Sequence, residues 1–155
     1  MYEVGQHATW DLFDEFLEGN PHGIVAVIGM RQLAEAARTA CQNSMSALGY
    51  GKGACTFVCL QPDGQSERLD PAAVRALLEG LDPLCIIVAD AESAAVMAQA
   101  YEQSIALDRP NRILGRDVAA FRNLSALMDT PQNKQRAWAL FKTLPRFGEF
   151  NRKKA

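Results

Sequence analysis

The stretch that most constrains the fold is a run of five apolar residues, 24–28, enclosed by Gly23 and Gly29. Because every position is apolar, the run does not fit a strand with one wet face, in which apolar and polar residues alternate. A short run rich in Val and Ile is typical of a strand covered on both faces, as in parallel sheets. Two further runs, at 54–60 and 84–89, have the same character.

Helical patterns separate these runs, and the alternation of strand and helix predicts crossover connections. We therefore expect an α/β fold, a three-layer α/β/α domain with a mostly parallel sheet of three to five strands. Segment 111–121 is ambiguous: 113–115 or 117–121 could form a fourth strand, and 117–121 fits a helical turn equally well. The apolar periodicity predicts helices near residues 10–18, 30–48, 71–81, 91–107 and 131–144.

Residues with cap chemistry mark the starts of several predicted helices. Thr9, Asp70 and Thr130 each precede a helical pattern, and their side-chain oxygens can accept hydrogen bonds from the first free N–H groups. Pro71 and Pro131 follow two of these caps at the first helical position, where a missing N–H costs nothing.

The glycine-rich stretch 49–53 resembles a phosphate loop only superficially. Such a loop follows a strand and opens a helix. Here the order is helix, glycines, strand, so we expect Gly49 to cap the preceding helix and the stretch to form a turn.

Length and composition indicate one soluble domain spanning residues 1–155. A chain of this size buries a sufficient core without disulfides, and no apolar run approaches the ~18 residues that span a bilayer. The N-terminus has neither a basic nor an apolar export region, so a cytoplasmic location is expected. The cysteines are expected to be reduced and buried, Cys41 in a helix and Cys55, Cys59 and Cys85 in strands.

Charge is distributed unevenly along the chain. Segment 109–155, expected to be a basic helical end of the domain, has eleven Lys and Arg residues against three acidic ones (+8), whereas the rest has five basic and fifteen acidic residues (−10). This asymmetry predicts an anionic partner, a nucleic acid or an acidic protein, including another copy of the chain. Alternatively, the two parts attract each other within one chain, or the charges are merely solvated. The candidate surface comprises Arg116, Arg122, Lys134, Arg136, Trp138, Lys142 and Arg146, with Arg152–Lys154 behind it.

A second candidate site follows from the parallel sheet, because ligands bind outside the carboxyl ends of its strands. Arg31, expected in the first helical turn, could pair with an anion, and Asp90 could act as a base. A cap role for Asp90 and a solvated Arg31 are the alternatives. The expected crevice residues are Gly29, Arg31, Gln61, Asp63, Asp90 and Ser93.

No catalytic or metal-binding motif is present in the sequence. His7 and His22 lack ligand spacing, and Cys55 and Cys59 would share one face of a buried strand. We therefore expect no metal or cofactor and lean against an enzyme. The leading hypothesis is a binding or adaptor domain whose basic end contacts an anionic partner. The alternatives are a small-ligand-binding domain or small enzyme using the crevice, and an assembly subunit in which Trp10 or Trp138 marks an interface.

Overall fold

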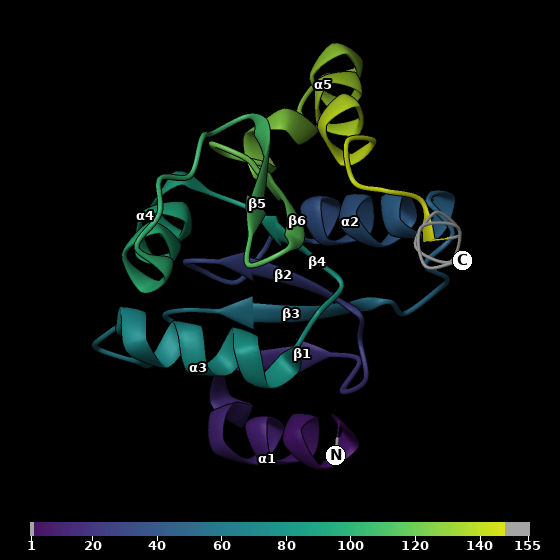
Figure 1. Cartoon of the computed structure of the whole chain (residues 1–155). Coiled ribbons are helices and arrows are strands. Elements are labelled where there is room, and N and C mark those ends of the chain that lie inside the picture. Colours follow the sequence, from purple (N-terminus) through teal and green to yellow (C-terminus); the bar gives the residue numbers. More distant parts are fainter. Residues whose placement is uncertain (1, 148–155) are drawn as a thin grey trace.

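The computed structural model describes residues 2–147, which contain a six-stranded mixed sheet in the order β1-β3-β2-β4-β6-β5 (Figure 1). The inner strands β3, β2, β4 and β6 are parallel, and the edge strands β1 and β5 are antiparallel to their neighbours. The strands are β1 (Leu17–Gly19), β2 (Val25–Gly29), β3 (Cys55–Cys59), β4 (Cys85–Val88), β5 (Arg109–Ile113) and β6 (Arg116–Ala120).

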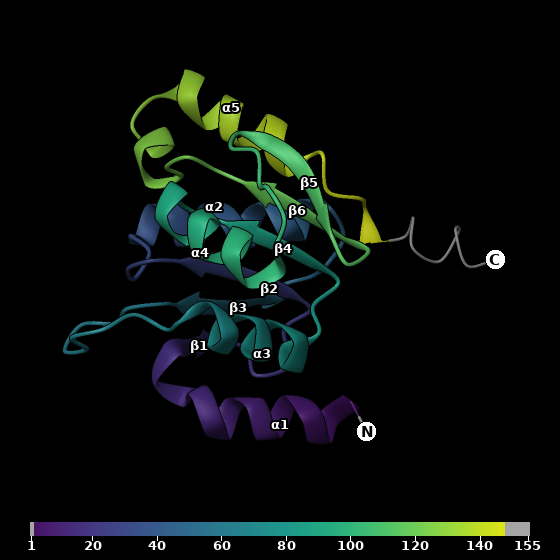
Figure 2. The same ribbon diagram turned by 60° about the vertical axis from the view of Figure 1, so that its left-hand side comes forward.

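Five α-helices and two short 3₁₀ helices complete the described part of the chain (Figures 1 and 2). None of these helices is long and apolar enough to cross a membrane. The α-helices are α1 (Tyr2–Phe13), α2 (Glu35–Ala47), α3 (Pro71–Leu81), α4 (Ala91–Tyr101) and α5 (Pro131–Phe141), and the 3₁₀ helices are η1 (Asp14–Phe16) and η2 (Ser125–Met128).

The α/β fold class and the three apolar strands are confirmed. The runs at 54–60 and 84–89 contain β3 and β4, and the run at 24–28 covers all of β2 except its last residue, Gly29. β2 lies between the other two strands, with Val25 opposite both Cys55 and Cys85. The prediction of three to five strands is wrong, because residues 2–147 contain six. The additional strands form where pairing with a neighbour decides the conformation of a short segment.

The first additional strand, β1, lies inside the segment predicted as a helix over 10–18. The helix instead spans Tyr2–Phe13, and residues 17–19 pair antiparallel with β3, placing Leu17 opposite Val58. Thr9 is therefore not a cap: it lies within α1, where its hydroxyl donates to the carbonyl of Gly5 (2.8 Å).

The second additional strand belongs to a hairpin in the ambiguous segment. β5 and β6 pair across a turn at Leu114 and Gly115, both of which have positive φ (48° and 83°). A two-residue turn with positive φ at both positions has a backbone twist that matches the twist of the two strands it connects. Leucine rarely adopts positive φ. The basic segment 109–155, expected to be helical, thus begins with two strands, and its described helices follow them.

Helix ends agree with the predicted caps at two positions and differ at two others. Asp70 accepts from the N–H of Ala73 (2.8 Å), and Thr130 accepts from the N–H of Asn133 (3.1 Å). In contrast, α2 begins at Glu35 rather than near residue 30, and α4 ends at Tyr101 rather than 107 because the next residue is left-handed (φ 52°).

Two apolar clusters lie on opposite faces of the sheet, using alternate residues of the same strands. Ile28 belongs to the cluster with α1, α3 and α4, and Val27 to the cluster with α2 and α5. Burial on both faces explains why the inner strands are continuously apolar. The described residues form a single compact domain.

Candidate functional site

A hollow of about 240 Å³ lies at the carboxyl ends of β2 and β4. Strand order reverses at this point, since β3 and β4 follow β2 in the chain but lie on opposite sides of it. Open α/β sheets bind ligands at such a reversal, where the loops after two adjacent strands diverge. The lining residues come from the loop after β2, the start of α4 and the segment after β6, and include Met30, Arg31, Leu33, Asp90, Arg122 and Asn123.

Asp90 connects two of the segments that line this hollow. One carboxylate oxygen accepts from the N–H of Met30 (2.9 Å), and the other accepts from the N–H (2.7 Å) and the hydroxyl (2.8 Å) of Ser93. Asp90 therefore caps α4 and ties it to the end of β2. Both oxygens are engaged, and Ser93 is fully buried, so the structure favours the cap over the base for Asp90.

Gly29, the last residue of β2, lies close to the loop that follows this strand. A Cβ at this position would lie 2.8 Å from the Leu33 side chain and 3.4 Å from an Asp90 carboxylate oxygen. The Leu33 side chain could rotate away, but the carbonyl oxygen of Arg31 would lie 3.2 Å from the new Cβ, so a larger residue would require a small shift of the loop after β2.

Two arginines stand at the rim of the hollow. Arg31 is exposed and makes no hydrogen bond or ion pair within residues 2–147. It lies in the loop between β2 and α2, which corrects its predicted place in the first helical turn. Arg122 approaches Asp108 at 3.8 Å, but the two side chains are 71% and 54% exposed. Water screens such a pair strongly, leaving the Arg122 guanidinium available to another anion.

A second, more open hollow of about 740 Å³ adjoins the first and shares Arg31 with it. Asp63 lies on its other side, on an exposed turn. Arg38 also lines it, but is already held by Glu18 (2.6 Å) and by the ring of Phe57, whose centroid lies 4.3 Å from the guanidinium carbon. Among the described residues that line this hollow, Arg31 is therefore the one arginine whose side chain has no partner.

The structure thus divides the predicted crevice residues into two groups. Arg31, Asp63 and Asp90 line the two hollows. Gly29, Gln61 and Ser93 support the surrounding backbone: the Gln61 amide, for example, donates to the carbonyls of Gln65 and Ser66. Sequence reasoning did not assign Arg122, Asn123 and Ser125 to the smaller hollow, because the position of β6 beside β4 could not be predicted; Arg122 had been predicted on the basic surface instead.

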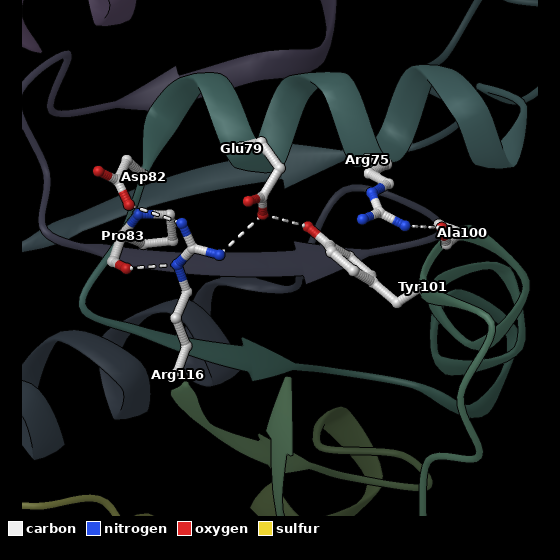
Figure 3. Close-up of polar contacts among 7 residues, drawn as sticks. All are labelled: Arg75, Glu79, Asp82, Pro83, Ala100, Tyr101 and Arg116. Carbon is white, nitrogen blue, oxygen red and sulfur yellow. Dashed lines mark hydrogen bonds and ion pairs between the residues drawn. The ribbon is translucent and has the colours of Figure 1, made fainter. Parts of the chain in front are cut away.

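The residues of the predicted basic surface are distributed over several parts of the structure, and only those on or just after α5 lie near one another. Arg116 is enclosed by Glu79 (2.7 Å), Asp82 (2.6 Å) and the carbonyl of Pro83 (2.9 Å), and its side chain is 13% exposed (Figure 3). Tyr101 donates to the same Glu79 carboxylate (2.8 Å). This cluster joins the basic segment to the acidic body, as one of the sequence-based alternatives proposed.

The other cations line different hollows. Arg122 lies at the strand-end hollow, Lys134 and Trp138 line a groove between α2 and α5, and Arg136 lines a further hollow beside Leu140. Lys142 and Arg146 lie together at a fourth position. Arg152–Lys154 lie outside the described residues.

The thiols are poorly suited to nucleophilic chemistry. Cys41, Cys55 and Cys85 are free and buried, and burial raises the pKa of Cys55 and of Cys85 to about 12. The half-buried Cys59 also has a raised pKa, chiefly because of burial. No group of three or more His, Cys, Asp or Glu residues within the described part of the chain could hold a metal ion.

No protein-family model and no curated protein matches the sequence of this chain. The functional argument therefore depends on the geometry of the strand-end hollow. Its lining contains two guanidinium groups at the rim, an amide and a hydroxyl nearby, the Asp90 carboxylate, which is already bound to backbone N–H groups, and the exposed carboxylate of Glu92.

Proposed function

We propose that this chain is a binding domain for a small organic anion, seated in the hollow at the carboxyl ends of β2 and β4. The observation that carries this proposal is the placement of Arg31 and Arg122 at the rim of that hollow. The three-layer α/β/α arrangement, which we infer from an apolar cluster on each face of the sheet, is one in which ligands bind at this point.

The expected ligand carries a phosphate or carboxylate group. A guanidinium offers a planar fork of donors that matches such oxyanions. Asn123 accepts from the N–H of Ala126 through its carbonyl oxygen (3.2 Å), so its NH₂ group can donate to the ligand. At about 240 Å³, the hollow is smaller than the ~300–1,000 Å³ of drug-sized sites, which favours a compact molecule.

The state of Asp90 favours a structural role for this carboxylate over a role as general base; Glu92, the other carboxylate that lines the hollow, is exposed. General-base catalysis needs a carboxylate within reach of a substrate proton. Both Asp90 oxygens already accept hydrogen bonds from Met30 and Ser93. Free, buried thiols fit a reducing compartment, so we propose the cytoplasm as the location.

A nucleic-acid surface along the basic C-terminal third is the weaker proposal. It needs several cations aligned for consecutive phosphates. Arg116 is enclosed by two carboxylates, and the remaining cations of the predicted surface are divided among four hollows, with Lys142 also near the groove that Lys134 lines.

The test is a thermal-shift titration with inorganic phosphate, glycerol phosphate and malate, followed by calorimetry of any probe that stabilises the protein. A probe present at a hundred times its Kd adds about 2.7 kcal/mol to the free energy of unfolding, a rise of roughly 5–11 °C in Tm for a chain of this size. Arg31→Gln and Arg122→Gln should each weaken binding by about tenfold.

Arg109→Gln is the matched control, because Arg109 is an exposed arginine on β5 that lines neither strand-end hollow. Equal losses in all three variants would show a nonspecific ionic effect and contradict the proposed site. So would the absence of stabilisation by every probe at low salt.

A further inference from the structure

A groove of about 400 Å³ runs between α2 and α5, on the face of the sheet opposite to α1, α3 and α4. Small side chains of α2 form one wall, so the groove is open along that helix. Trp138 and Phe141 form the other wall, from α5. The α2 residues that line it are Ala36, Thr39, Ala40, Asn43 and Ser44.

The rim of this groove is basic. Lys134 lines it, and its side chain makes no hydrogen bond or ion pair with another described residue. The Lys142 ammonium lies 5.9 Å from the centre of the Trp138 ring. Segment 131–142, which holds α5, contains three Lys or Arg residues and no acidic residue. The groove therefore presents an apolar wall beside unneutralised positive charge.

The outer face of α1 has the complementary character. Leu12 is 74% exposed, the highest fraction among the large apolar side chains that the structure describes, and Ala8 is exposed one helical turn before it. Asp11 and Glu15, the latter in η1, flank Leu12 and are also exposed; Asp11 lies 3.6 Å from His7, and Glu15 accepts a hydrogen bond from the side chain of Gln65 (2.7 Å). The first 30 residues hold five acidic residues and no Lys or Arg.

These two surfaces cannot meet within one molecule. α1 lies at one end of the domain and α5 at the other, in both views of the chain (Figures 1 and 2). A contact between them must therefore join two copies.

We propose that the outer face of α1 of one copy docks in the α2–α5 groove of another, so that the chain self-associates head to tail. Leu12 enters the groove beside Trp138, and Asp11 and Glu15 face Lys134 and Lys142. An amphipathic helix laid in an apolar groove is a common mode of recognition. Because the two contacting surfaces differ, the contact is heterologous and each added copy leaves one free surface at each end.

Two properties of the contact follow from its composition. One helix in one groove buries less than a standard interface of ~1,600 Å², so association is weak and requires concentrated protein. The charges at its rim are exposed, so salt weakens it.

Sedimentation velocity over a wide range of protein concentration, at low and high salt, tests the proposal on the full chain. Leu12→Ser and Lys134→Glu should each weaken association by about tenfold or more. Both residues are exposed, so the variants keep the fold, which circular dichroism verifies. Matched controls are Leu114→Ser, at another exposed leucine (60%), and Lys52→Glu, at another exposed lysine; neither should change association.

A mixing experiment distinguishes this contact from other kinds of dimer. The Leu12→Ser copy keeps its groove, and the Lys134→Glu copy keeps its α1, so an equimolar mixture should form one-to-one pairs and stop there. A wild-type chain that stays monomeric at low salt and high concentration would overturn the proposal, as would association unaffected by both variants. Salt-sensitive binding of labelled single-stranded DNA that Lys134→Glu abolishes, with no self-association, would assign the groove to a nucleic acid instead.

Discussion

Replacing Arg116 with alanine should destabilise the protein more than removing any other cation of the predicted basic surface that the structure describes. The Arg116 guanidinium makes three hydrogen bonds, to Glu79, to Asp82 and to the carbonyl of Pro83 (Figure 3). It joins the start of β6 to the end of α3 across 33 to 37 residues of chain. Desolvation lowers its pKa, but the two carboxylates outweigh this and raise it, so the group stays charged.

The magnitude follows from how exposed its partners are. A buried hydrogen bond to a charged group contributes about 1.5–3 kcal/mol. Glu79 and Asp82 are 37% and 38% exposed, so water partly replaces the lost arginine and each pair is worth about 0.5–1 kcal/mol. The hydrogen bond to the Pro83 carbonyl contributes about 1 kcal/mol more. Arg116→Ala should therefore lower the free energy of unfolding by about 2–3 kcal/mol, which corresponds to a fall of roughly 4–12 °C in Tm.

Urea unfolding of Arg116→Ala, Glu79→Gln and the double variant measures the coupling between the two side chains, expected to be about 1 kcal/mol. Arg112→Ala is the control: Arg112 pairs with Asp117 (3.1 Å) and donates to the carbonyl of Gly115 (2.8 Å), but its side chain is 62% exposed, so the loss should stay within about 1 kcal/mol. Equal losses for Arg116→Ala and Arg112→Ala would refute the reasoning.

Two further predictions concern packing and pH. Gly80→Ala would normally stabilise a helix by about 1 kcal/mol, but here the new Cβ would lie 2.1 Å from the Thr9 hydroxyl, so we expect a net loss of about 1 kcal/mol in chemical denaturation. Thr9→Ala should reduce that loss, and an unchanged loss would contradict the clash. Burial raises the pKa of Cys55 from 9.0 to about 12, so the folded protein retains a proton that the unfolded chain releases, and stability should fall between about pH 9 and pH 12. Cys55→Ala should remove up to about 1.4 kcal/mol per pH unit of that slope, measured by urea unfolding at several pH values, and an unchanged slope would contradict the assignment.

The sequence by itself determined the inner part of the fold. A run such as 24–28 is apolar at every position because both faces of β2 are covered. This property can be recognised from consecutive residues alone. Asp70 and Thr130 could be identified as caps for the same reason: a cap acts on N–H groups two or three residues away.

Only the tertiary structure decided which segments form the edge strands of the sheet and where the charged side chains lie. Residues 17–19 are a strand because β3 offers an open edge, and residues 109–113 because a turn folds them back on β6. Arg116 was predicted on an open surface, but residues of α3 and of the segment after it enclose it. Arg122 joins Arg31 at the strand-end hollow only because β6 lies beside β4. These outcomes depend on residues far apart in the chain, whose proximity no local pattern records.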